Sequence, residues 1–403
     1  MTNLPSAKSA DTYEFVRSVI LRFFMTESRF TIPEITEITG LSTTTVAKCV
    51  ARMKDEGLLD EVSVEDSHGR GRRAIVYGIG KSSSHFLGVD VHDGDLGFAI
   101  MNFTGDIIRE EHDNSYVFEN TYANLELVLS KIDSFLDGDS GFQRSQIARA
   151  NFNLSGRVDS REGTSASVFN FEETQATPLA EILSERLGMP VTIENDTKAM
   201  AFAEYLSCGE KWQNVLYANI SWGLGLGIIL GGEIYFGSNG FSGELGHVHY
   251  YNNNILCHCG KKGCIETEVS GSAIHRKLLE RIRGGESSVL SNKVRRGDKV
   301  TIGDIVKAAD NDDPLCIDLI SKTGSELGRH MAAMINVLNP DAIILGGSVA
   351  QAASYNFEQY VSLAMRQNSL KLVSRNVKVL TSSLGNRAGV TGACMLARER
   401  INL

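Results

Sequence analysis

The chain has 403 residues, which predicts two or three domains. Its 42% hydrophobic and 22% charged residues are typical of a globular protein. The net charge of −9 gives no general support for nucleic-acid binding, so any DNA contact must come from a local patch. The sequence shows no signal peptide and no apolar run of about 18 residues, so we expect a cytoplasmic protein without a membrane partner.

The first 80 residues predict a helix-turn-helix. Residues 13–25 have apolar side chains at helical spacing. A second helix is expected to begin at Thr31, where a capping residue, a proline and Glu34 follow one another, and to end near Gly40. A third helix is expected from residue 43 to 56 with Ser42 as its N-cap. This order of helices and turn is typical of a DNA-binding module.

A basic wing is expected between two strands at 58–62 and 74–77, because three arginines stand on a glycine-rich tip. The third helix presents small hydroxyl and basic residues that suit a major groove. The residues expected to contact double-stranded DNA are Ser42, Thr43, Thr44, Lys48, Arg52, Arg70, Arg72 and Arg73. The alternative is a helical module with an ordinary solvated loop, because residues 1–80 are not basic overall.

The rest of the chain predicts a mixed α/β architecture after a short linker at 81–84. From residue 271 onward the pattern is mainly helical, apart from a buried strand that enters a glycine turn at 342–347. The other elements expected are strands at 86–91, 96–101, 107–108, 147–154 and 191–194, helices at 122–136, 178–187 and 197–206, and two strands within 215–236.

Three cysteines within eight residues indicate a metal site in a chain that lacks a secretion signal. Soft sulfur ligands with one imidazole favour Zn²⁺, and four protein ligands make a closed, structural site. The candidate ligands are Cys257, Cys259 and Cys264 with one imidazole from His247, His249 or His258. The alternative is a set of buried thiols without a metal.

The motifs at 194–197 and 244–266 resemble those of the ROK family (repressor, open reading frame, kinase). The resemblance spans the whole chain, since the repressor branch also carries an N-terminal winged helix. It implies an α/β fold with a winged helix-turn-helix followed by a two-lobed actin-like ATPase/hexokinase (ribonuclease H-like) domain. We expect domains at 1–80, 84–195 and 196–403, with the C-terminal helix returning to the first lobe.

The resemblance also implies the site residues. The family motif Gly-Glu-x-Gly-His makes His247 the fourth ligand of one structural zinc per chain, beside Cys257, Cys259 and Cys264. The zinc would hold His247 and Glu266 in position. The sugar contacts implied are Gly156, Asn170, Asn195, Asp196, Glu244, His247 and Glu266, with Ser155 replacing a proline of the family. Taken alone, Asn195 and Asp196 would instead be read as a helix cap.

The loops that bind ATP in the family's kinases are altered. Asp90-Val91-His92-Asp93-Gly94 lacks two glycines and the threonine of Asp-x-Gly-Gly-Thr, and Asp93 adds negative charge. In the second loop Trp222 replaces the threonine of Gly-Thr-Gly, while Gly346 and Gly347 of the third loop are retained. We therefore expect no ATP requirement, and we interpret Asp196, the base position of the kinases, as a retained sugar contact.

These features predict a transcriptional regulator, expected to repress genes of carbohydrate metabolism. A homodimer or homotetramer would place two winged helices on a palindromic operator, with half-sites about 10 base pairs or a multiple apart. A sugar or sugar phosphate would change lobe closure and release the DNA. Control by a protein partner is a further option. The alternatives are an ATP-dependent sugar kinase, and a zinc-containing scaffold whose N-terminal domain binds a protein.

Overall fold

A computed structural model of the chain describes residues 9–23, 29–64, 74–80, 85–138, 143–209, 211–352 and 357–400. The chain divides into two compact units. The first consists of Met1–Phe152, Ala180–Thr192 and Ala393–Leu403, and the second of Asn153–Leu179 and Ile193–Gly392. The expected linker at 81–84 and the tip of the expected wing lie outside the described residues.

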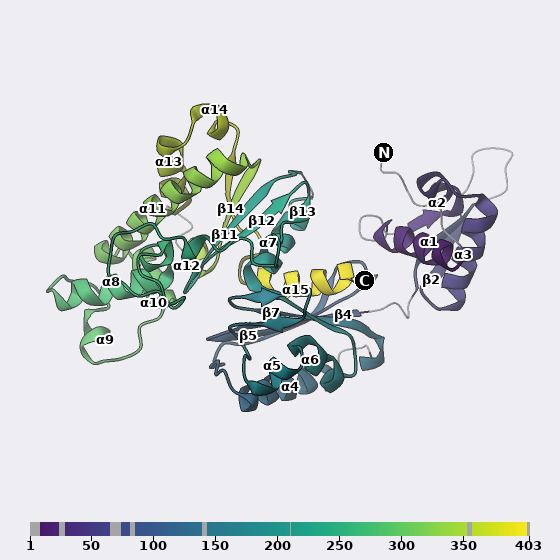
Figure 1. Cartoon of the computed structure of the whole chain (residues 1–403), viewed down its shortest axis with the longest axis horizontal. Coiled ribbons are helices and arrows are strands. Elements are labelled where there is room, and N and C mark those ends of the chain that lie inside the picture. The colour runs from purple at the N-terminus through teal and green to yellow at the C-terminus, as the bar shows by residue number, and fades with distance from the viewer. Residues whose placement is uncertain are drawn as a thin grey trace. The chain divides into compact units, whose positions relative to one another are not determined.

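The N-terminal part of the first unit has the three predicted helices and the two predicted strands (Figure 1). It also has a short strand that the sequence pattern did not reveal, so that the sheet has the order β1-β3-β2. A strand of three residues is too short to show an alternating pattern. The elements are α1 (Ser9–Phe23), β1 (Arg29–Thr31), α2 (Ile32–Thr39), α3 (Thr43–Asp55), β2 (Leu59–Val64) and β3 (Ile75–Ile79).

The predicted caps define the limits of α2 and α3. The Glu34 carboxylate accepts hydrogen bonds from the backbone N–H (2.5 Å) and the hydroxyl (2.8 Å) of Thr31, and Gly40 ends α2 with φ of 66°. The Ser42 hydroxyl accepts from the backbone N–H of Thr45 (3.2 Å) at the start of α3. The apolar face of α3 is buried, as the spacing predicted, through Val46, Cys49, Val50 and Met53.

The first five-stranded sheet has the order β10-β7-β4-β5-β6. Its strands are β4 (His85–His92), β5 (Asp95–Met101), β6 (Ile107–Asp113), β7 (Ile147–Leu154) and β10 (Val191–Asn195). Within the first unit, α4 (Tyr122–Asp137) and α6 (Leu179–Leu187) cover one face and the end of α15 (Ala388–Glu399) covers the other (Figure 1). The Cys394 sulfur on α15 lies 3.3 Å from the carbonyl oxygen of Ala99, which fixes this helix on the sheet.

The second five-stranded sheet has the order β13-β12-β11-β14-β15. Its strands are β11 (Val215–Ile220), β12 (Leu224–Leu230), β13 (Glu233–Ile234), β14 (Ala342–Gly346) and β15 (Lys378–Thr381). Residues 215–236 thus form three strands and not the two expected, and β15 interrupts the helical C-terminal part. Both unexpected strands have four residues or fewer, too few for a clear pattern.

The alternation of side chains along β11 explains how this sheet is buried on both faces. Leu216, Ala218 and Ile220 point into a core with α8, α10 and α11, while Val215 and Tyr217 pack against α7. The helices of the second unit are α5 (Glu172–Ala176), α7 (Asp196–Ser207), α8 (Gly271–Arg283), α9 (Ser291–Arg295), α10 (Ile302–Asp310), α11 (Pro314–Leu338), α12 (Ser348–Ala352), α13 (Phe357–Asn368) and α14 (Lys371–Ser374). The second unit also contains a small antiparallel hairpin of two short strands, β8 (Val158–Asp159) and β9 (Thr164–Ser165).

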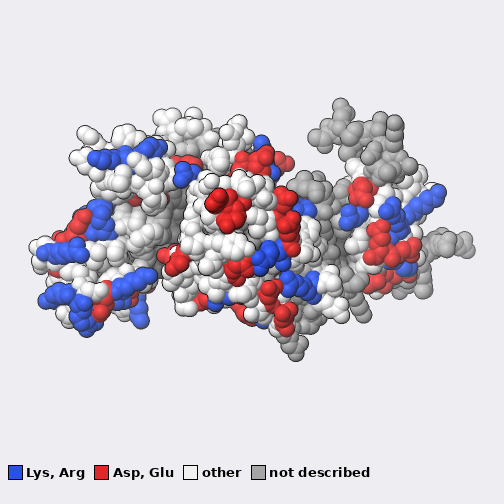
Figure 2. Space-filling model, turned by 60° about the horizontal axis from the view of Figure 1, so that its bottom comes forward, with Lys and Arg blue, Asp and Glu red and all other residues white. Residues whose placement is uncertain are grey.

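The surface carries charges of both signs. In the view of Figure 2, acidic and basic side chains lie side by side on the N-terminal part, and Lys and Arg gather over the segment that contains α8 and α9. None of the helices in the described ranges combines the length and the apolar character needed to cross a membrane.

Candidate functional site

The predicted metal ligands come together in the second unit. His247 ends a short 3-10 helix at Leu245–His247, and the three cysteines lie on the loop that follows. One ligand atom of each of the four residues lies within 4.8 Å of those of the others. The Cys259 and Cys264 sulfurs are 3.6 Å apart, and Cys257 Sγ is 3.5 Å from His247 Nδ1. A tetrahedral zinc with Zn–S bonds of about 2.3 Å requires separations of roughly 3.8 Å and 3.6 Å. The geometry fits a tetrahedral metal ion.

The two competing imidazoles have other partners. His249 Nδ1 lies 3.0 Å from the carbonyl oxygen of Lys262, and His258 Nε2 lies 2.8 Å from Glu266 Oε1. Burial raises the pKa of the Cys257 thiol, and a bound cation would favour its thiolate form. Among the described residues, His247 is therefore the imidazole that joins the three sulfurs.

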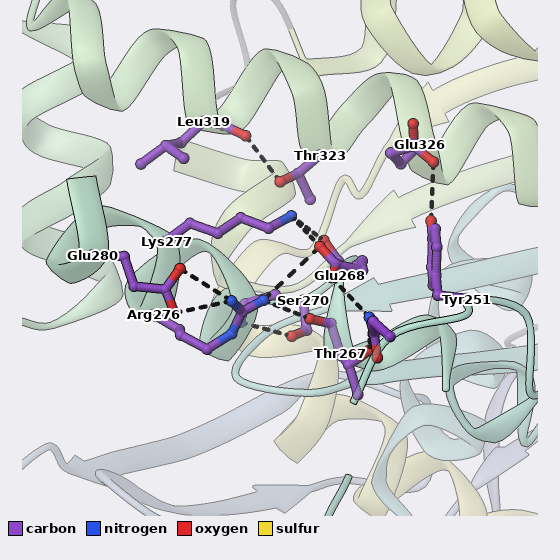
Figure 3. Close-up of polar contacts among 12 residues, drawn as sticks. Tyr251, Thr267, Glu268, Ser270, Arg276, Lys277, Glu280, Leu319, Thr323 and Glu326 are labelled. Carbon is purple, nitrogen blue, oxygen red and sulfur yellow. Dashed lines mark hydrogen bonds and ion pairs between the residues drawn. The ribbon is translucent and has the colours of Figure 1, made fainter. Parts of the chain in front are cut away.

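Polar contacts hold the chain on both sides of the cysteine loop, residues 257–264, to α8 and α11 (Figure 3). The Tyr251 hydroxyl donates to Glu326 on α11 (2.9 Å). Just after the loop, Glu268 accepts from Lys277 Nζ on α8 (2.7 Å) and from Asn253 Nδ2 (2.9 Å). These anchors were not predicted, because the partners are 9 to 75 residues apart and share no pattern.

The predicted sugar motif lies at the start of α7. The Asn195 side-chain oxygen accepts from the backbone N–H of Lys198 (3.1 Å), so this residue does cap the helix. Its side-chain nitrogen donates to the carbonyl oxygen of Gly156 (2.9 Å), which brings a second predicted sugar contact to the motif. Asp196 is 8% exposed, and its carboxylate accepts from the Ser155 hydroxyl (2.9 Å) and the Thr197 backbone N–H (2.6 Å).

Glu266 and Glu244, two further predicted sugar contacts, lie beside the His-Cys₃ cluster. Glu266 is 5% exposed and accepts from the backbone N–H of Leu224 (3.0 Å). Burial alone would raise the pKa of Glu266, but the hydrogen bonds from His258 and Leu224 outweigh it and hold this pKa below its usual value. Glu244 Oε2 lies 3.7 Å from His247 Nε2, while Cys257 Sγ lies near the other ring nitrogen, Nδ1.

Asn170, the remaining predicted sugar contact, lies in the same unit. Its side-chain nitrogen donates to the carbonyl oxygen of Ala166 (3.2 Å), and its oxygen accepts from Gln175 (3.3 Å). Its role in sugar binding stays a prediction.

Asn219 joins the predicted sugar motif to the second and third nucleotide loops, and it was not predicted from the sequence. It is 6% exposed, its nitrogen donates to the Thr197 hydroxyl (3.0 Å), and its oxygen accepts from the Ser221 hydroxyl (2.9 Å). A Cβ on Gly347 would lie 2.5 Å from this oxygen, so the third loop also packs against Asn219. Asn219 is the only amide in the apolar run 215–220. A polar side chain in a buried strand needs a hydrogen-bond partner, and this could have marked it as part of a site.

The second nucleotide loop packs against His275, Thr197 and Glu266. Trp222 is 55% exposed, with its ring centre 5.6 Å from that of His275. A Cβ on Gly225 would lie 2.4 Å from the Thr197 hydroxyl, and one on Gly223 would lie 2.8 Å from Glu266. Close packing against Thr197 and Glu266 therefore requires glycine at both positions.

The first nucleotide loop lies in the other unit, where its charged side chains interact locally. His92 Nε2 lies 3.0 Å from Asp90 Oδ2, and Asp93 accepts from the backbone N–H of Phe118 (3.1 Å). His92 and Asp93 stand where the family's kinases have two glycines, and Gly94 stands where they have a threonine. The added carboxylate is unfavourable for an ATP phosphate.

The residues expected to contact DNA fall into three groups. Thr43, Thr44 and Lys48 are exposed on α3. Ser42 caps that helix, and Arg52 is held by Glu56 (3.0 Å) and by the Tyr13 ring, 3.7 Å from its guanidinium carbon. Arg70, Arg72 and Arg73 lie outside the described residues.

A helix-turn-helix precedes two five-stranded sheets, and a His-Cys₃ cluster lies near the predicted sugar contacts. This is the arrangement expected for a regulator built on a sugar-kinase fold. The ROK family model matches residues 86–400, and the chain belongs to the ROK family.

Two regulators match nearly the full length of the chain. The DNA-binding transcriptional dual regulator NagC of Escherichia coli K12 is 29% identical over 372 residues, covering 92% of this chain and 89% of NagC. The crystal structure of a ROK family transcriptional regulator, a homologue of E. coli Mlc, aligns with a TM-score of 0.80 and 26% identity, covering 97% of this chain and 98% of that one. These similarities confirm the predicted family and fold.

A kinase of the family matches a smaller part. The ROK glucokinase from Streptomyces griseus, solved with glucose and AMPPNP, aligns with a TM-score of 0.67 and 25% identity over 78% of this chain and 100% of the kinase. The regulators thus share more of the chain than this kinase does.

Proposed function

We propose that the chain is a DNA-binding transcriptional repressor of carbohydrate genes, and that its kinase-like domain senses a sugar or sugar phosphate without phosphorylating it. One observation carries the proposal: the sugar motif and the His-Cys₃ cluster are intact, while two nucleotide loops are altered in a chain that matches regulators along nearly its whole length. In this proposal residues 1–80 bind DNA, and 84–195 and 196–403 form the two lobes.

The carboxylates of Asp196, Glu244 and Glu266 suit sugar hydroxyls, because each can accept hydrogen bonds from O–H groups. A sugar with a differently placed hydroxyl would leave one of these groups unpaired, which is how a polar site rejects the wrong ligand. His247 links this set to the metal cluster through its position between Glu244 and Cys257. A zinc bound by His247, Cys257, Cys259 and Cys264 would fix the loop that carries Glu266.

Thermal unfolding with a ligand panel tests the proposal. A ligand at about 100 times its Kd stabilises a protein by about 2.7 kcal/mol. We expect stabilisation by glucose, N-acetylglucosamine, xylose or one of their phosphates, and none by Mg-ATP. By linkage, the same ligand should weaken operator binding. A chain that responds to none of these sugars would contradict the sensor function.

Lys48→Ala is expected to weaken operator binding several-fold, because this lysine is exposed on α3 and can pair with a DNA phosphate. The loss of affinity should be similar for different DNA sequences, because a phosphate contact does not read bases. The slope of log affinity against log salt concentration should fall by about 1. Fluorescence anisotropy with an operator duplex selected from random DNA measures both.

Lys54→Ala is the matched control on the same helix, since Lys54 Nζ is 2.6 Å from Glu61 and engaged within the protein. Equal losses in the two variants would mean that α3 does not place Lys48 on the DNA.

The kinase alternative predicts ADP release from Mg-ATP in the presence of a hexose. We expect no turnover, because Trp222 and Asp93 stand where phosphate-binding groups are needed. A coupled assay with glucose, N-acetylglucosamine and xylose measures this. Turnover that disappears in Asp196→Asn would establish the kinase, since Asp196 occupies the position of the general base.

A further inference from the structure

Lys198 is a buried cation in the first turn of α7, and it is not part of the sugar motif discussed above. The residue is only 3% exposed. Burying an ammonium group costs free energy unless hydrogen bonds and opposite charges offset it. The hydrogen bonds and charges around Lys198 therefore indicate which interactions stabilise its buried ammonium group.

The Lys198 ammonium holds a distant segment of the chain. Its Nζ donates to the carbonyl oxygen of Gly240 at 2.7 Å. Gly240 belongs to the segment 235–244, which connects β13 with Glu244. A Cβ on Gly240 would lie 3.5 Å from the carbonyl oxygen of Val158. Gly240 is therefore also in contact with the chain two residues after Gly156. Lys198 thus lies where three segments with predicted sugar contacts meet.

Three carboxylates interact electrostatically with this ammonium. They come from Glu194 on β10, Asp196 on α7 and Glu244 on the segment 235–244. Burial lowers the pKa of Lys198, and the three carboxylates act in the opposite direction. Glu194 is fully buried, so without a cation its charge would add to the repulsion among the three acids.

We infer that Lys198 is a positioning residue of the sugar site, which fixes Glu244 through Gly240 and offsets the charge of the neighbouring carboxylates so that they can accept hydrogen bonds from sugar hydroxyls. The inference rests on the proposed function of the same site. A lysine that only stabilises the fold would change the unfolding temperature and leave the pH profile of sugar binding unchanged.

Calorimetric titration of the full chain with glucose, N-acetylglucosamine and xylose tests the inference between about pH 6 and pH 10. Sugar affinity of the unmodified protein should fall as pH rises through the lowered Lys198 pKa, because the charged form is the one that organises the site. Lys198→Met should bind about tenfold more weakly near neutral pH and should lose this alkaline decline. Unchanged affinity and an unchanged profile in Lys198→Met would overturn the inference.

Hydrogen exchange of residues 235–244 gives a readout that needs no sugar. We expect faster exchange in Lys198→Met than in Lys293→Met, a control in which a lysine 2.7 Å from Asp304 is removed elsewhere in the same unit. Equal exchange in the two variants would refute the positioning role. If the unmodified protein binds none of the three sugars, the proposed function fails, and exchange alone then decides whether Lys198 holds the segment. If Lys198→Met does not fold, the alkaline decline of the unmodified protein decides the inference.

Discussion

Cys264→Ser is expected to remove the metal and disorganise the sugar site. Cys264 is fully buried, its sulfur is 3.6 Å from Cys259 Sγ, and Glu266 follows two residues later. A serine oxygen is a much poorer zinc ligand than a thiolate, and structural zinc sites contribute about 10–16 kcal/mol of apparent binding free energy in small domains. Elemental analysis should change from one zinc per chain to almost none, with a clear fall in the unfolding temperature and a loss of sugar binding.

Cys316→Ser is the matched control for this experiment. Cys316 is also fully buried but lies on α11 outside the cluster. The Cys316→Ser substitution should lower the free energy of unfolding by about 1–3 kcal/mol and leave the zinc content unchanged. A Cys264→Ser protein that keeps both its metal and its sugar affinity, or an unmodified protein that folds without metal, would contradict the zinc assignment.

Glu266→Gln is expected to reduce sugar affinity about 100-fold, which corresponds to about 2.7 kcal/mol. The carboxylate accepts from the Leu224 N–H with one oxygen and lies 2.8 Å from His258 with the other. A glutamine has an NH₂ group in place of one of these oxygens, so a donor would face a donor at one of the two contacts. It would also remove a charged acceptor from the sugar site. The variant should still bind operator DNA but release it only at much higher sugar concentration, which titration calorimetry and anisotropy can measure.

Glu268→Gln separates this effect from general destabilisation. Glu268 lies two residues further along the chain and contacts Lys277 on α8 (Figure 3). It also accepts a hydrogen bond from Asn253. We expect this variant to lose some stability and to keep its sugar affinity within about twofold. Similar losses of affinity in both variants would mean that Glu266 acts through folding and not through contact with the sugar.

Local signals in the sequence were sufficient for much of the fold. The caps at Thr31 and Ser42 and the apolar spacing of α3 depend on residues within one or two helical turns, so they can be read without tertiary information. The strands β1, β13 and β15 were missed because two to four residues do not establish a period. Their pairing is determined by the longer strands beside them.

The sequence by itself determined the family and identified the His-Cys₃ cluster as a candidate metal site, because residue types at fixed spacing carry that information. The tertiary structure alone decided which distant polar and charged side chains act together. It placed the Arg52 guanidinium over the Tyr13 ring, joined Asn219 to Thr197, and brought the Lys198 ammonium to the carbonyl oxygen of Gly240. These partners include pairs separated by 22 to 42 residues, so only the folding of strands and helices against one another brings them together. Burial then gives such contacts their strength, because an unpaired polar group away from water is costly.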